Sequence, residues 1–91
     1  MEDELKGETL LKFPTVFPIK VMGRREDGFA QTVADIVVRH APDFDPASME
    51  MRPSRNGRYL GLTVTINAKS KAQVDAIYQE LSSNPMVIMA L

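Results

Sequence analysis

Residues 56–68 read NGRYLGLTVTINA. From Tyr59 to Ala68 every second side chain is apolar, and one face carries Leu60, Leu62, Val64 and Ile66. Because successive side chains of a strand point to opposite faces, this alternation predicts a β-strand with one buried face. The preceding Asn56 and Gly57 favour the two positive φ angles of a tight turn. We therefore predict a hairpin whose second strand covers residues 59–68.

Three further segments are predicted to be strands. Residues 47–54 form the first half of the hairpin, because methionines alternate there with polar side chains. Residues 16–23 alternate in the same way and bury Phe17, Ile19 and Val21. Residues 86–91 form a short apolar strand at the end of the sequence.

Two segments have the apolar spacing of a helix. Phe29 to His40 places apolar side chains three or four positions apart, with Asp27 as the expected N-cap and Pro42 beyond the end. A second helix begins at Ser70, which has the spacing of a capping box with Gln73. Its buried stripe is expected to contain Val74, Ile77, Tyr78 and Leu81.

The resulting order is β-α-β-β-α-β, which is typical of the α+β ferredoxin-like sandwich. Right-handed connections place both helices on one face of a four-stranded antiparallel sheet. We expect a single domain over residues 13–91, preceded by a flexible acidic extension over residues 1–12. The other face of the sheet is left open, and its expected outward residues are Lys20, Met22, Glu50, Arg52, Tyr59, Thr63 and Thr65.

Composition excludes several classes of function. The 91 residues contain no Cys and one His, so thiolate chemistry, disulfides and the common metal sites are not expected, and neither is a cofactor. The formal net charge of −1 gives no general attraction to nucleic acid or anionic membranes. The start of the chain is acidic and no segment is apolar enough to span a bilayer. We therefore expect a cytoplasmic protein, monomeric or weakly dimeric.

The loop after the first strand is the first candidate ligand site. It contains Gly23, Arg24, Arg25 and Gly28, and a helix N-terminus favours anions. A small anionic metabolite could bind there. The alternative, which we favour from sequence, is a solvated turn in which Glu26 and Asp27 neutralise the arginines.

The hairpin carries a second basic cluster, made of Arg52, Arg55 and Arg58. These side chains could dock an acidic ligand or protein segment, or they could simply keep the hairpin soluble. RNA stacking is not expected, because Tyr59 is the one aromatic side chain that the open face offers. His40 ends the first helix, where a structural role is expected.

The last strand is apolar on both faces. We expect Val87, Met89 and Leu91 to face the helices, which leaves Met86, Ile88 and Ala90 on the open side. Met86 and Ile88 are therefore candidate partner-binding residues. Either residues 10–14 cover them as a lid or a second protein chain does, and we favour the lid.

Short motifs along the chain resemble the small bacterial YbeD-like proteins. They are Phe13-Pro14, Lys20 to Gly23, Arg39 to Pro42, Pro53-Ser54, Thr63 to Ala68, Ile77-Tyr78 and Val87 to Leu91. The resemblance covers residues 10–91 and implies a ferredoxin-like fold similar to ACT regulatory domains, with no established activity. A lipoate-linked regulatory role has been proposed for that family. In ACT domains, small effectors bind near the loop after the first strand.

Three functions follow as hypotheses. The leading one is a non-enzymatic, ACT-like regulatory or interaction domain that binds a small effector at Gly23 to Gly28. The second is an acylphosphatase-like enzyme, which would use the same loop, although Ala30 stands where an Arg is expected and Asn67 lies at the wrong end of its strand. The third is a protein adaptor that uses the open sheet face.

Overall fold

The fold, seen in a computed structural model that describes residues 12–91, contains four strands, two α-helices and one short 3₁₀ helix. Most of the expected acidic extension, and Leu10 and Leu11 of the expected lid, lie outside the described residues. The elements are β1 (Thr15–Arg24), α2 (Phe29–His40), η1 (Pro46–Ser48), β2 (Glu50–Pro53), β3 (Tyr59–Ala68), α3 (Lys71–Ser83) and β4 (Val87–Ala90).

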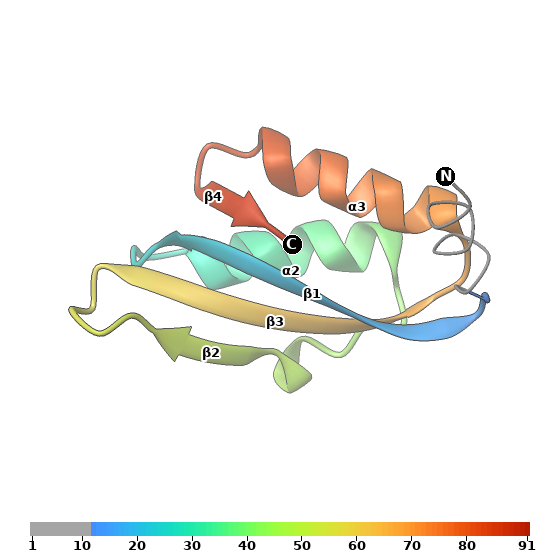
Figure 1. Ribbon diagram of the computed structural model, residues 1–91, viewed down its shortest axis with the longest axis horizontal. Coiled ribbons are helices and arrows are strands. Elements are labelled where there is room, and N and C mark those ends of the chain that lie inside the picture. The colour runs from blue at the N-terminus through green and yellow to red at the C-terminus, as the bar shows by residue number, and fades with distance from the viewer. Residues whose placement is uncertain (1–11) are drawn as a thin grey trace, which may run out of the picture.

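The four strands form one antiparallel sheet in the order β2-β3-β1-β4. The two central strands pair along their whole length, from Thr15 opposite Ala68 to Arg24 opposite Tyr59. Both helices lie against the same side of the sheet (Figure 1). The predicted ferredoxin-like sandwich, with its β-α-β-β-α-β order, is therefore confirmed.

The hydrophobic core lies between the helices and one face of the sheet. Ile19 and Val21 of β1 are buried there beside Leu62, Val64 and Ile66 of β3. Apolar side chains of both helices complete this core, chiefly Phe29, Val33, Ile36, Val37, Val74, Ile77 and Leu81. Replacing one of the large core side chains by Ala would cost about 2–5 kcal/mol.

Two predicted helix and strand boundaries differ from the structure. Residues 47–54 do not form one strand, because Pro46 begins the 3₁₀ helix and β2 begins only at Glu50. The Asp45 side chain stabilises this turn by accepting a hydrogen bond from the Ala47 N–H at 3.0 Å. The N-cap of α2 is Gly28 with φ 86°, and not Asp27, so no side chain caps that helix.

The hairpin turn is also longer than the predicted two-residue turn. Gly57 has a positive φ of 78°, but Asn56 does not. Side chains bind the backbone of the loop instead: Ser54 Oγ accepts from the Tyr59 N–H at 3.1 Å, and Asn56 Oδ1 accepts from the Arg58 N–H at 3.1 Å. These local hydrogen bonds stabilise the wider loop.

The end of the last strand faces the opposite way to the prediction, whereas Val87 packs against the core as predicted. Met22 pairs with Met89 and Val21 pairs with Ala90, so Met89 lies on the open face and Ala90 faces the helices. The cause is an irregularity between Met22 and Gly23, where the pairing with β4 shifts register. The prediction that Met86 and Ala90 face the open side is wrong, since both pack against the core.

Polar contacts join the ends of the two helices. Arg39 and His40 of α2 both contact Glu80 of α3, with His40 Nε2 2.7 Å from Glu80 Oε1. Ser70 caps α3 as predicted, by accepting from the Gln73 N–H at 3.1 Å. The Gln73 side chain does not return this bond, and binds the Lys69 N–H and the His40 carbonyl. His40 therefore takes part in the contact between the helices.

Gly23 leaves no room for a side chain. A Cβ at this position would lie 2.4 Å from the Met86 carbonyl oxygen and 2.5 Å from the Phe29 ring. We predict that Gly23→Ala lowers the free energy of unfolding by about 1–3 kcal/mol, measured by urea denaturation. Gly61→Ala is the matched control, because a Cβ there lies 3.5 Å from the Arg52 carbonyl oxygen, an ordinary contact. Equal stability of the two variants would contradict this packing.

Stability should depend on pH through Asp43. Lys69 Nζ donates to Asp43 Oδ2 at 3.1 Å, and this bond lowers the pKa of Asp43 below its ordinary value of 3.8. Because the folded pKa is below the unfolded pKa, the stabilisation is present above the unfolded pKa and lost as pH falls through the folded one. Asp43→Asn should therefore be less stable than the natural chain above about pH 5, and the difference should shrink towards about pH 2.

Urea denaturation at a series of pH values checks this prediction. Asp27→Asn is the control, because Asp27 is exposed and forms no ion pair within residues 12–91. A stability difference for Asp43→Asn that stays constant between acid and neutral pH would show that the carboxylate contact with Lys69 does not contribute.

Candidate functional site

Two loops that are distant in the sequence meet at one end of the sheet. The β1–α2 loop lies beside the β2–β3 hairpin at the left end of the molecule in Figure 1. The Arg25 N–H donates to the Arg58 carbonyl oxygen at 2.8 Å, and Arg24 pairs with Tyr59 across the strands. The Arg25 guanidinium also lies against the hairpin, 3.4 Å from the position of a Cβ on Gly57. The two predicted basic clusters thus contribute to one basic end.

A hollow of about 520 Å³ lies between these loops. It is lined by Arg24, Arg25, Glu26, Arg58 and Tyr59. None of the three arginines forms an ion pair with a carboxylate of residues 12–91. The solvated turn in which Glu26 and Asp27 neutralise the arginines stays a prediction, and the structure shows that neither carboxylate forms a direct ion pair with them. Three guanidinium groups beside one carboxylate leave the hollow with an excess of positive charge.

Other predicted site residues lie outside this hollow. Gly23 is buried under the Phe29 ring and has a packing role. Gly28 is exposed and caps α2, and Arg55 is exposed in the hairpin loop. Arg52 belongs to β2, where it pairs with Gly61 and so shares the open face of the sheet with it.

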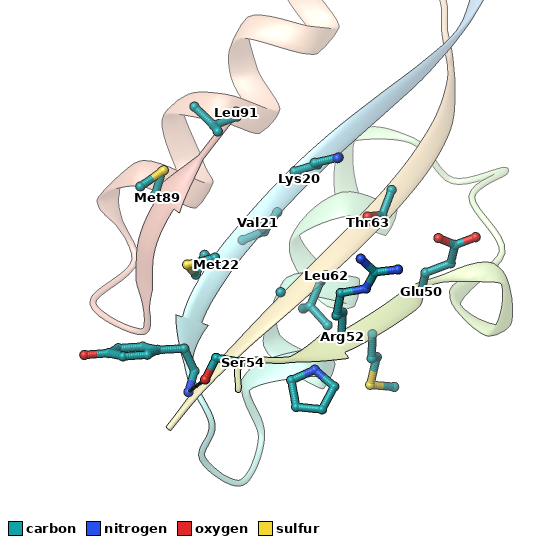
Figure 2. A pocket seen from close by; sticks show the side chains of 14 residues that line it. Lys20, Val21, Met22, Glu50, Arg52, Ser54, Leu62, Thr63, Met89 and Leu91 are labelled. Carbon is teal, nitrogen blue, oxygen red and sulfur yellow. Dashed lines mark hydrogen bonds between the residues drawn. The ribbon is translucent and has the colours of Figure 1, made fainter. Parts of the chain in front are cut away.

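A second hollow, of about 790 Å³, lies on that open face. Figure 2 shows the side chains that line it, including Met22 of β1, Met89 and Leu91 at the end of the chain, and Arg52 of β2. Gly61 lies between Met22 and Arg52 in the row of paired residues that crosses the sheet. Because Gly61 has no side chain, this row is open at its centre. Tyr59 lines both hollows, so they adjoin.

The predicted partner-binding residues of the last strand lie elsewhere. Met86 is half-buried against the core, and Ile88 is 53% exposed but does not line the open-face hollow. The described part of the predicted lid does not cover this hollow either. Phe13 packs against the core instead, and neither Phe13 nor Pro14 lines the hollow.

Sequence reasoning did not single out Gly61, Met89 or Leu91 as residues that line the open-face hollow. A Gly inside a strand pattern often marks a close approach by another molecule, and Gly61 carried that signal. The two apolar residues were assigned to the wrong face because the register shift at Gly23 has no clear sequence signature apart from the Gly itself.

Arginine side chains dominate the basic end. Within residues 12–91, no group of three or more His, Cys, Asp or Glu side chains is placed to hold a metal ion. None of the helices in this part of the chain is long and apolar enough to cross a lipid bilayer. The arginines of the basic end supply planar, bidentate donors, which suit carboxylates and phosphates.

Comparisons with known proteins place the chain in a family. Residues 8–91 match the family model described as a protein of unknown function, DUF493. The UPF0250 protein of Bordetella pertussis is 51% identical over 84 residues, which are 92% of each chain. That of Leptothrix cholodnii is 47% identical over 91 residues, the full length of both.

A solved structure supports the fold. The solution structure of protein HP0495 from H. pylori is similar to this chain, with a TM-score of 0.72 over 89% of this chain and 85% of the other. Because the two sequences are only 16% identical, this structural similarity supports the fold and nothing about function. The family model and the curated relatives go further, and they agree with the resemblance to YbeD-like proteins: like the UPF0250 proteins named above, which it resembles over most of its length, the chain belongs to the DUF493 family.

Proposed function

We propose that this chain is a non-enzymatic binding domain whose ligand is a small metabolite with a carboxylate or phosphate group. The observation that carries the proposal is the convergence of Arg24 at the end of β1, Arg25 of the β1–α2 loop and Arg58 of the hairpin, none of which forms an ion pair with a carboxylate of residues 12–91. Like charges that are held together repel each other, and an anion between them relieves this repulsion. The hollow is therefore suited to an anion.

The backbone of the basic end positions these side chains before a ligand arrives. The Arg25–Arg58 hydrogen bond joins the two loops, and Arg24 continues the regular pairing of β1 with β3. Less ordering is then needed on binding, which improves affinity. A regulatory role agrees with the resemblance to ACT domains, in which the loop after the first strand lies near the effector.

Hydrolysis of an acyl phosphate is less well supported. An acylphosphatase-like reaction needs a side chain that positions water beside the bound phosphate. The candidate Asn67 pairs with Val16, at the opposite end of β3 from Tyr59 and the basic hollow. Ala30 supplies no guanidinium at the start of α2. The hollow thus offers anion binding without the water-positioning group.

Titration with pyrophosphate and citrate, followed by amide NMR at constant ionic strength, tests the proposal. We expect saturable shifts at Arg24, Arg25 and Arg58, with a dissociation constant of about 1 mM or below. Arg25→Gln and Arg58→Gln should each weaken binding by about tenfold, because each removes a charged donor. Arg55→Gln is the matched control, since this hairpin arginine does not line the hollow.

Two outcomes would count against the proposal. Shifts that never saturate would indicate general ionic effects and not a site. Equal weakening by Arg55→Gln and Arg58→Gln would show that the net charge of the hairpin, and not the geometry of the hollow, controls binding.

A further inference from the structure

The open face of the sheet combines apolar and cationic side chains in an ordered way. Met22 and Met89 are paired neighbours on β1 and β4, and they are 42% and 44% exposed. Leu91, beside Lys20, is 69% exposed. On the other side of Gly61, β2 contributes the cationic Arg52. The face therefore has apolar side chains at Met22, Met89 and Leu91, an open centre at Gly61, and cations at Lys20 of β1 and Arg52 of β2 (Figure 2).

Positive charge dominates this face. Lys20, Arg24 and Arg52 share it, because alternate residues of a strand lie on one face, and Glu50 supplies the one acidic side chain among the residues that line the hollow. None of these four side chains forms an ion pair within residues 12–91. Within this described part of the chain, the cations therefore have no acidic partner.

The charges and the apolar side chains together restrict what can cover the face. A second copy of the chain, placed face to face, would bring three cations against three cations, with only one carboxylate on each side. The repulsion between these like charges disfavours a second copy as the partner. A nucleic acid would find Tyr59 alone as a stacking ring. A protein segment with acidic residues beside large apolar ones satisfies both the charged and the apolar sides.

We propose that the open face is a docking surface for an acidic protein segment whose apolar side chains cover Met22, Met89 and Leu91, while its carboxylates reach Arg52 and Lys20. The gap above Gly61 receives one side chain of that segment. This surface adjoins the anion site of the proposed function: Tyr59 lines both hollows, and Arg24, on the same face of β1 as Lys20 and Met22, lines the anion site.

Selection of peptides from a random displayed library on the natural full-length chain tests the proposal. We expect the selected peptides to combine Asp or Glu with Leu, Ile, Met, Phe or Trp. Gly61→Val should weaken their binding by about tenfold or more, because the new side chain fills the hollow. The fold should tolerate it, since Gly61 has an ordinary φ and its Cβ meets only the Arg52 carbonyl, at 3.5 Å.

Matched variants make the result specific. Thr65→Val changes the same face of β3 outside the hollow, and it should leave binding unchanged. Arg52→Glu should weaken binding by about tenfold or more, and Arg55→Glu, the same charge change outside both hollows, should have a much smaller effect. Arg25→Gln should weaken pyrophosphate binding and spare the peptides, which separates this surface from the anion site.

Several results would overturn the proposal. These are a failure to select any peptide, selected peptides without acidic residues, and peptide binding that survives Gly61→Val. Sedimentation that shows a dimer of the natural chain, lost in Gly61→Val, would assign the face to a second copy instead.

Discussion

Burial of one face of β1 and β3 against the two helices is the interaction on which the structure depends. Ile19, Val21, Leu62 and Val64 are each at most 1% exposed, and each such side chain contributes about 1.5–3 kcal/mol by leaving water. Because strand side chains alternate, the same residues that build the core force their neighbours onto the other face. Both helices lie on one side, so residues 12–91 leave that other face open.

Two glycines show how a missing side chain allows close packing in one place and leaves a hollow in another. At Gly23 the missing side chain lets Phe29 and the Met86 backbone approach β1, which brings α2 and the last strand together. At Gly61 no group of the described chain occupies the space above the sheet, and a hollow remains. The difference lies in what the topology places above each glycine, which a local sequence pattern does not contain.

The fold could be predicted because its signals are local and periodic. The alternation in residues 59–68 and the helical spacing in residues 29–40 identified those elements with the correct inner faces. The predictions were wrong in two places. In the hairpin loop, side-chain hydrogen bonds determine the backbone conformation, and in the last strand, a register shift determines which side chains face the core. The basic end was predicted as two separate clusters, because the contact between Arg25 and Arg58 depends on the strand order and not on sequence spacing.

Residues 12–91 leave one face of the sheet uncovered, and both proposed binding surfaces depend on this. The most direct test is the rate of methionine oxidation by hydrogen peroxide in dilute protein, resolved by peptide mass spectrometry. Met22 and Met89 on the open face should oxidise nearly as fast as the exposed Met51, whereas the half-buried Met86 should react several-fold more slowly. Protection of Met22 and Met89 equal to that of Met86 would contradict the account.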